Sequence, residues 1–277
     1  MPGASRDRSS PLPGFGLSLG ITILWLSLIV LIPLSAVFLK SASEGWHSFL
    51  AAAASPRAIA AYRLSFGAAA LGAGINCVFG LLVAWVLVRY RFKGRRLLSA
   101  LIDLPFALPT AVAGIALTAL YADTGIIGGL LTRIGFPVAY RPAGVVVALT
   151  FIGLPFVVRT VEPVLAEVSS EVEEAALTLG ATRLQTFVRV ILPTIAPALA
   201  TGFALAFARG AGEYGSVIFI AGNVPYQSEI APLLIITQLE EYNYAGAAAI
   251  ACVMLLISFT VMLLLNLLQH WQQRRGT

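Results

Sequence analysis

The feature that most constrains this chain is a series of long apolar stretches. A helix needs about 20 apolar residues to cross the hydrocarbon core of a bilayer. Six stretches reach or approach that length: Phe15–Leu39, Leu64–Val88, Leu97–Tyr121, Pro142–Val158, Thr194–Gly222 and Ala245–Gln269. The sequence therefore predicts an all-α fold, a polytopic transmembrane helical bundle with six spans.

The composition supports this class and excludes several others. Of the 277 residues, 58% are hydrophobic and 11% are charged, whereas soluble domains have about 25% charged residues. Such a chain has too little polar surface for a cytosolic enzyme, a disordered protein or a disulfide-stapled secreted domain. Cys77 and Cys252 lie in apolar runs, and His47 and His270 are the two histidines. We therefore expect no disulfide, no metal site and no catalytic residue.

The first apolar stretch is expected to remain in the membrane as a helix. Arg6 and Arg8 precede it, as basic residues precede the apolar region of a signal peptide. That region has roughly 7–15 residues in signal peptides, whereas the apolar run here extends from Phe15 to Leu39. The length of the run favours a retained helix over a cleaved leader.

The distribution of lysine and arginine predicts the orientation of the bundle. Basic residues concentrate in the N-terminus, the second and fourth connections and the C-terminus, and cytoplasmic loops carry this excess. Both termini are therefore expected in the cytoplasm, where the net charge of +5 would face anionic lipid rather than nucleic acid. The residues on this side are Arg6, Arg8, Arg89, Arg91, Lys93, Arg95, Arg96, Arg159, Arg183, Arg189, Arg274 and Arg275.

The fifth apolar stretch carries small residues at every fourth position. Small side chains at this spacing let helices approach closely, which favours association inside a membrane. The pattern therefore predicts helix packing. The two rows are Ala200, Ala204, Ala208 and Gly212, and Gly202, Ala206 and Gly210.

The connection between the fourth and fifth stretches, residues 162–193, is too acidic to lie in lipid. Its acids are Glu162, Glu167, Glu171, Glu173 and Glu174. Ser170 and Glu173 have the spacing of a capping box, an apolar stripe follows, and Gly180 is expected to end the first helix. The stripe consists of Val172, Ala175, Ala176 and Leu179.

A second short helix is predicted to follow the glycine. Thr182 and Gln185 have the spacing of another capping box, and Pro193 and Pro197 are expected to end the helix where the fifth span begins. Its apolar stripe consists of Leu184, Phe187, Val188 and Ile191. Two amphipathic helices around a sharp bend are typical of a docking element. A helix lying on lipid is the alternative, which the acidic first helix disfavours because anionic headgroups would repel it.

The segment EAALTLGATRLQTFVRVILP, from Glu174 to Pro193, resembles the EAA signature of binding-protein-dependent ABC importer permeases. That signature is Glu-Ala-Ala, three residues, Gly, nine residues, an aliphatic residue, any residue and Leu-Pro. Val190 stands where the family more often has Ile. The resemblance implies a type I ABC importer permease fold and a coupling helix that seats in a cleft of a cytoplasmic ATPase. The coupling residues would be Glu171, Glu174, Ala175, Ala176, Gly180, Leu192 and Pro193.

Three further segments narrow the resemblance to the T-type permeases for sulfate and thiosulfate, with molybdate permeases as the nearest sister group. These segments are Phe92–Tyr121, Ile152–Leu165 and Arg209–Asn223. The resemblance implies a heterodimer with a homologous second permease subunit in the inner membrane. It also implies a cytoplasmic ABC ATPase dimer and an extracytoplasmic sulfate-binding protein as partners.

On this basis we divide the chain into four parts. Residues 1–14 would be a cytoplasmic tail, 15–39 the first transmembrane helix, 60–268 an ABC transmembrane type-1 permease domain and 270–277 a second cytoplasmic tail. Within the permease domain the spans would cover about 64–88, 97–121, 142–158, 194–222 and 245–269, with the coupling loop at 162–193.

The sequence carries no signature of a nucleotide-binding loop. Lys40 and Lys93 are the two lysines and neither follows a glycine, so the phosphate-binding G-x-x-x-x-G-K-[ST] pattern is absent. ATP is therefore expected in a partner subunit, and no cofactor is expected in this chain. Gly16–Gly20 fits the G-x-S-x-G pattern of hydrolases, but that motif requires a strand–turn–helix setting, whereas this one begins a membrane helix.

Three ionisable residues fall within the predicted spans: Asp103, Arg209 and Glu213. Charges inside a membrane are costly and mark functional positions by default. Arg209 and Glu213 are four residues apart and can pair on one helix face. Arg209 is either a pathway residue for an oxyanion or one half of a purely structural ion pair. Asp103, which would repel an anion, is expected to be a helix-end or interhelical partner.

Prolines and an external segment complete the predicted site. Pro105 and Pro109 interrupt helical hydrogen bonds, which is tolerated where a helix lines a cavity or gate, so they are assigned with Arg209 and Glu213 to the substrate pathway. The Gly222–Asn223 turn and the amphipathic segment Ile230–Leu239 are expected to form the lip where a binding protein docks. Arg159 is either a pathway residue or a cytoplasmic anchor.

The sequence thus predicts a permease subunit that imports sulfate or thiosulfate by alternating access and has no enzymatic activity. One alternative is a molybdate or tungstate permease, since these are also tetrahedral dianions. A more distant alternative is a membrane-embedded enzyme or a passive channel, which would work without an ATPase.

Overall fold

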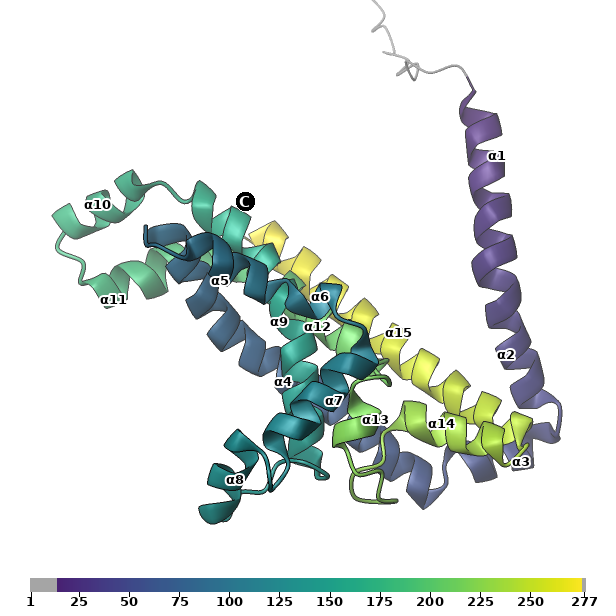
Figure 1. Ribbon diagram of the computed structural model, residues 1–277. Coiled ribbons are helices and arrows are strands. Elements are labelled where there is room, and N and C mark those ends of the chain that lie inside the picture. Colours follow the sequence, from purple (N-terminus) through teal and green to yellow (C-terminus); the bar gives the residue numbers. More distant parts are fainter. Residues whose placement is uncertain (1–13, 276–277) are drawn as a thin grey trace, which may run out of the picture.

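The structure is a computed structural model that describes residues 14–275, so most of the predicted N-terminal tail, with Arg6 and Arg8, lies outside the described residues. Every regular element in the described range is helical (Figure 1). The helices are α1 (Phe15–Leu26), α2 (Ile32–Ala42), α3 (Gly45–Ala53), α4 (Pro56–Arg89), α5 (Arg95–Ile102), α6 (Leu104–Ala107), α7 (Thr110–Tyr121), α8 (Ile126–Arg133), α9 (Pro142–Glu167), α10 (Ser170–Thr178), α11 (Arg183–Thr186), α12 (Leu192–Ala211), α13 (Val217–Ile220), α14 (Ala231–Glu240) and α15 (Tyr244–Arg275).

Five continuous helical segments are long and apolar enough to cross a membrane, and the bent pair α7 and α8, which meet at 44°, would make a sixth. The five are Phe15–Ala42, Pro56–Arg89, Pro142–Glu167, Arg183–Ala211 and Tyr244–Leu267. The polytopic all-α bundle expected from the sequence is therefore confirmed.

The third predicted span, 97–121, is not one helix. It is divided into α5, α6 and α7, with the breaks at Asp103 and at Leu108–Pro109. Proline lacks an N–H donor and drives the preceding residue toward extended backbone, and Leu108 has φ −81° and ψ 134°. The bend expected at Pro105 and Pro109 is thus a complete interruption of the helix.

The fourth and fifth spans also differ from their predicted bounds. Helix α9 continues past Val158 to Glu167 with Pro155 and Pro163 inside it, because its apolar face extends that far: Val161 and Leu165 are fully buried. The fifth span ends at Ala211 rather than at Gly222. Beyond Ala211 the chain turns at Gly212, and the segment that follows packs against α7.

A π-helical turn explains why Pro193 and Pro197 do not end the helix before the fifth span, as had been expected. Residues Phe187–Ile191 form this turn, in which the Leu192 N–H bonds the Phe187 carbonyl. In a regular α-helix the Pro193 ring would clash with the carbonyl one turn earlier. The wider π turn lies at this position. The same device, residues Ser27–Leu31, precedes Pro33 between α1 and α2.

Helices α4, α9 and α12 form the core of the bundle. Gly202 of α12 lies so close to α9 that a Cβ atom there would be 2.9 Å from the Cα of Val157. Gly153 of α9 faces the side chain of Asn76 on α4 in the same way. Gly202, Ala206 and Gly210, one of the two predicted small-residue rows, are all buried, so the packing predicted for this row is confirmed. In the other row Ala204 is buried, whereas Ala208 and Gly212 are exposed.

The remaining helices surround this core. Helix α2 packs against α15, as do α3 and α14. Helix α1 has no buried residue and stands apart from the bundle (Figure 1). At the opposite end of the bundle from α3, α8 and α14, the short helices α10 and α11 project beyond the core (Figure 1).

Replacement of Gly202 by alanine should destabilise the bundle, because the added methyl would overlap the backbone of Val157. Overpacking of this kind costs about 1–3 kcal/mol. The matched control is Gly67→Ala in α4, where a Cβ would meet nothing within 4 Å and where alanine should be neutral or stabilising. Unfolding in mixed micelles, followed by circular dichroism, measures both. Equal midpoints for the two variants would contradict the packing described here.

Candidate functional site

The predicted coupling loop projects from one end of the bundle (Figure 1), and its first helix is largely exposed. Helix α10 has no buried residue, and Glu171, Glu174 and Ala175 are exposed to solvent. Large apolar side chains are exposed beside them, namely Val172, Leu177, Leu179 and Leu184. Exposed apolar side chains gathered on a projecting element are typical of a surface that a partner covers.

Gly180 shapes the sharp bend between the two short helices. Its φ is +84°, a value that glycine adopts without the steric penalty of other residues. The Ala181 N–H bonds the Ala176 carbonyl at 3.1 Å, and the Gly180 N–H bonds the Leu177 carbonyl at 3.0 Å. This pair of bonds is a Schellman motif, so the C-terminal position predicted for Gly180 is confirmed.

Of the two predicted capping boxes, one forms and one does not. Thr182 accepts from the Gln185 N–H, and the Gln185 side chain accepts from the Thr182 N–H, as predicted. The Ser170–Glu173 box is wrong: Ser169 is the N-cap residue and makes no side-chain cap bond. Glu173 pairs instead with Arg89, and local spacing in the sequence cannot show this long-range ion pair.

Leu192 and Pro193, the last predicted coupling residues, begin α12 directly after the π turn. The helix is continuous from Arg183 to Ala211. Helix α11 therefore lies on the same continuous helix as Arg209.

The predicted ion pair between Arg209 and Glu213 is present. Nη1 of Arg209 donates to Oε2 of Glu213. The other carboxylate oxygen of Glu213 accepts from the N–H and the hydroxyl of Ser216, both at 3.0 Å. The Glu213 side chain is 3% exposed and that of Arg209 is 37% exposed, so the carboxylate is buried in a turn while the arginine side chain is partly exposed.

The structure brings the two halves of the predicted pathway together. The Glu213–Ser216 turn and α13 pack on α7, which starts directly after Pro109. A Cβ at Gly114 of α7 would collide with the backbone of Ser216, and one at Gly215 would collide with Thr110. Pro109 thus positions the helix that supports the Arg209–Glu213 turn, and Pro105 lies in the short α6 before it.

A second charged cluster, which was not predicted from the sequence, lies nearer the end of the bundle that carries α10. Arg159 of α9 donates to Asp103 at 2.9 Å, to Glu162 at 2.7 Å, and to the hydroxyl of Ser99 at 2.8 Å. The expected role of Asp103 as an interhelical partner is confirmed. Arg159 therefore links α9 to the interrupted third span through these hydrogen bonds. The sequence showed two ionisable residues at the edges of apolar runs, but it did not show that they form an ion pair.

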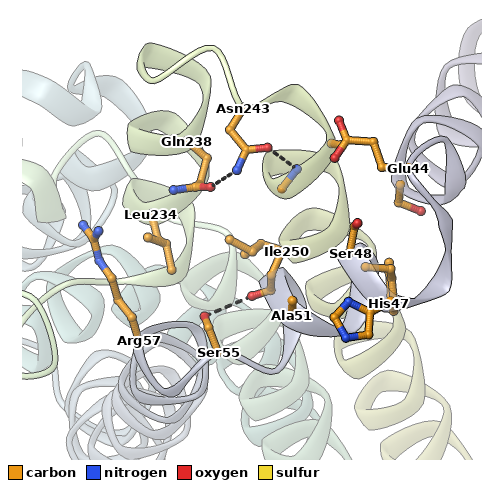
Figure 2. Close-up of a pocket in the computed structure, with 15 residues that line it drawn as sticks. Glu44, His47, Ser48, Ala51, Ser55, Arg57, Leu234, Gln238, Asn243 and Ile250 are labelled. Atoms are coloured by element: carbon orange, nitrogen blue, oxygen red, sulfur yellow. Dashed lines mark hydrogen bonds between the residues drawn. The ribbon is translucent and has the colours of Figure 1, made fainter.

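The external end contains a polar cavity of about 470 Å³ between α3, α14 and α15. Figure 2 shows Glu44, His47, Arg57, Gln238 and Asn243 around it. The segment predicted at Ile230–Leu239 is helix α14, which begins at Ala231 and buries Leu233 and Leu234. It is therefore packed on the bundle along one face.

Arg57 secures this external region in a way that the sequence did not predict. Its guanidinium donates two bonds of 2.7 Å to Glu229, whose side chain is 3% exposed. Asn223, at the predicted external turn, has φ +55°, and a Cβ at Gly222 would meet the backbone of Tyr140. Among the described residues, no group of three or more His, Cys, Asp or Glu could hold a metal ion.

Comparison with known proteins places this geometry in a family. The family model described as "Binding-protein-dependent transport system inner membrane component" matches residues 76–275. Two relatives are named sulfate transport system permease protein CysT. The one from Salmonella typhimurium is 49% identical over 95% of both chains, and the one from Escherichia coli is 48% identical over 95% of both.

Solved structures agree on the fold. A bacterial ABC transporter involved in the import of the acidic polysaccharide alginate superposes with a TM-score of 0.75 at 18% identity, covering 94% of each chain. The MetNI methionine ABC transporter, in an inward-facing conformation, superposes with a TM-score of 0.59 at 18% identity, covering 77% of this chain and 95% of that chain. The fold is thus the type I ABC importer permease fold expected from the sequence.

The family model matches most of the chain, and the two named relatives match it almost from end to end. Those relatives are transport permeases and not enzymes. The chain belongs to the binding-protein-dependent transport system inner membrane component family, the permease subunits of ABC importers.

Proposed function

We propose that this chain is the permease subunit through which sulfate or thiosulfate is imported across the inner membrane. The observation that carries the proposal is the 49% identity, over 95% of both chains, to a permease named for sulfate transport. Similarity at this level and coverage includes the turn around Arg209 and Glu213 as well as the coupling loop. An alternative cargo of the same shape and charge is molybdate or tungstate.

The energy for import would come from a separate ATPase dimer that binds ATP, so the chain itself needs no cofactor. Three observations support docking of that dimer on α10: its exposed carboxylates, the apolar side chains Val172 and Leu179 beside them, and the sharp bend at Gly180. Closure of the ATPase would push α10 and α11, and the continuous helix 183–211 would carry the displacement to the Arg209 turn.

The other partners follow from the same assignment. A homologous second permease would complete a heterodimer, and a sulfate-binding protein would dock at the end that carries the Gly222–Asn223 turn and α14. Lipid would cover apolar helices such as α1, and no nucleic acid is expected. The basic connection Arg89–Arg96 and the acidic α10 lie at one end of the bundle (Figure 1), which supports an orientation with both termini in the cytoplasm.

Within the pathway, Arg209 would interact with the anion. Nη1 is engaged by Glu213, and the Arg209 side chain is 37% exposed, so its remaining N–H donors would be available to an anion. A guanidinium presents several donors in a planar fork that suits an oxyanion. The buried carboxylate of Glu213 would hold this fork in position while the bundle alternates between inward- and outward-open states.

Transport by the reconstituted complex tests the cargo. Proteoliposomes that contain the chain with its second permease and ATPase should accumulate labelled sulfate when ATP and the sulfate-loaded binding protein are supplied. Unlabelled thiosulfate should compete, and molybdate should compete poorly. Uptake of molybdate without uptake of sulfate would overturn the assignment, and uptake that does not need ATP would indicate a channel.

Arg209→Gln should reduce sulfate uptake by about tenfold or more, because it removes charged hydrogen bonds to the anion. It also leaves the buried Glu213 unpaired, which is destabilising by itself. The double variant Arg209→Gln/Glu213→Gln removes both charges and separates these effects. We expect it to assemble normally and still fail to transport. If the double variant transports as well as the unaltered chain, the ion pair is structural only.

Gly180→Leu should uncouple ATP hydrolysis from transport, because a left-handed conformation costs roughly 1–2 kcal/mol for a side chain with a Cβ. A Cβ at this position would meet nothing within 4 Å, so the effect would come from the backbone and not from a clash. The control is Gly180→Asn, since asparagine tolerates this conformation. The ratio of sulfate taken up to ATP hydrolysed measures coupling. Full coupling in Gly180→Leu would show that the bend does not matter.

A further inference from the structure

An arginine at the end of α4 contacts the coupling loop. Arg89 is the last residue of α4, and its Nη2 donates to the carboxylate of Glu173 in α10. The same nitrogen lies 3.3 Å from the carbonyl oxygen of Val168, one of the two residues between α9 and α10. A single guanidinium thus connects α4 to both the first turn of α10 and the hinge before it.

Trp85, one helical turn earlier in α4, extends this junction to the second half of the loop. The guanidinium carbon of Arg89 lies 5.6 Å from the centroid of the Trp85 ring. The same ring packs edge to face with Phe187, with 5.6 Å between ring centroids. Phe187 belongs to the helix that continues into α12. Both sides of the Gly180 bend are therefore joined to the same turn of α4.

Apart from this junction, α10 is loosely held. It packs mainly against α11, and the two helices project together from the bundle (Figure 1). A cleft of about 380 Å³ is lined by Val172 of α10 and Thr194 of α12. Few contacts with the bundle and open space on this side leave α10 free to shift, so its movement has few routes into the core.

Helix α4, in contrast, is at the centre of the core and packs along both α9 and α12. A force applied at Arg89 would therefore act on the helices that position the Arg209 turn. The Arg89 and Glu173 side chains are 21% and 27% exposed, so the pair is partly shielded from water and its charges interact more strongly than those of a fully exposed pair. This ion pair joins α10 directly to α4.

We infer that Arg89 is a positioning residue for transport: it acts through Glu173 and the Val168 carbonyl to transmit the movement of the coupling helix α10 to α4. This inference rests on the proposed function, since it requires an ATPase that moves α10. Arginine suits the role because a planar fork can pair with a carboxylate while its face stacks on an aromatic ring. Lysine would keep the charge but not the fork.

The test uses the complete complex in proteoliposomes with ATP and the sulfate-loaded binding protein. Arg89→Gln and Glu173→Gln should each retain the ATPase subunits and the basal rate of ATP hydrolysis. Sulfate taken up per ATP hydrolysed should fall by about tenfold, within the range of coupling between distant sites. Arg91→Gln is the matched control, because it removes one charge from the same connection at an exposed residue and should leave this ratio unchanged.

The charge reversal Arg89→Glu/Glu173→Arg distinguishes transmission from folding. It restores an ion pair between the same two elements and should recover much of the uptake per ATP that either single variant loses. Arg89→Lys should give an intermediate ratio. Recovery in the reversal would not be expected if Glu173 acted only by contacting the ATPase.

Three results would overturn the inference. An unchanged ratio in Arg89→Gln would show that the pair is not in the transmission route. A defect in Glu173→Gln alone would assign Glu173 to the ATPase interface. Loss of the ATPase subunits from both Arg89→Gln and the reversal would make Arg89 a residue for assembly.

Failure of the proposed function would look different. In that case the unaltered complex would hydrolyse ATP without accumulating sulfate. The junction could still be tested in that complex by measuring how strongly the cargo-loaded binding protein stimulates ATP hydrolysis. This stimulation would be compared between the unaltered chain and Arg89→Gln.

Discussion

Close contact between α4, α9 and α12 is the constraint on which the rest of this structure depends. In a bilayer, helices gain no hydrophobic stabilisation by associating, so their packing relies on dispersion contacts and on backbones that approach closely. Gly153 and Gly202 provide this approach, with no room for a methyl group at either position. Once the three helices are packed, the positions of Arg89, Arg159 and Arg209 relative to one another are set.

The charged groups then act as ties between elements that the core alone does not hold. Arg159 ties the broken third span to α9, Arg57 ties the external connection to the start of α4, and Arg89 ties the coupling helix to the end of α4. Each guanidinium joins segments that are separated by an interruption of helical structure. Movement between inward- and outward-open states would have to preserve or exchange these ties, because an unpaired charge near the membrane is costly.

Much of the fold was predictable because its signals are local. The apolar spans follow from the need to satisfy backbone hydrogen bonds in lipid, and the Gly180 bend and the Thr182–Gln185 capping box follow from residue type and spacing. The bounds of the third and fifth spans were predicted less well, since Pro105 and Pro109 separate three helices while Pro193 and Pro197 are absorbed without a break. A π turn precedes Pro193, whereas Pro155 and Pro163 lie inside α9 without one, so residue type alone does not show which prolines interrupt a helix.

The sequence by itself determined that the chain is a bundle of membrane helices with an acidic amphipathic loop between its fourth and fifth spans, because hydropathy, helix caps and the EAA pattern are properties of contiguous residues. Only the tertiary structure decided which charges meet. Arg57 and Glu229 are 172 residues apart, Arg89 and Glu173 are 84 apart, and Arg159 and Asp103 are 56 apart. These pairings depend on how each helix is rotated and where it crosses its neighbours, and helix packing across the whole bundle sets both.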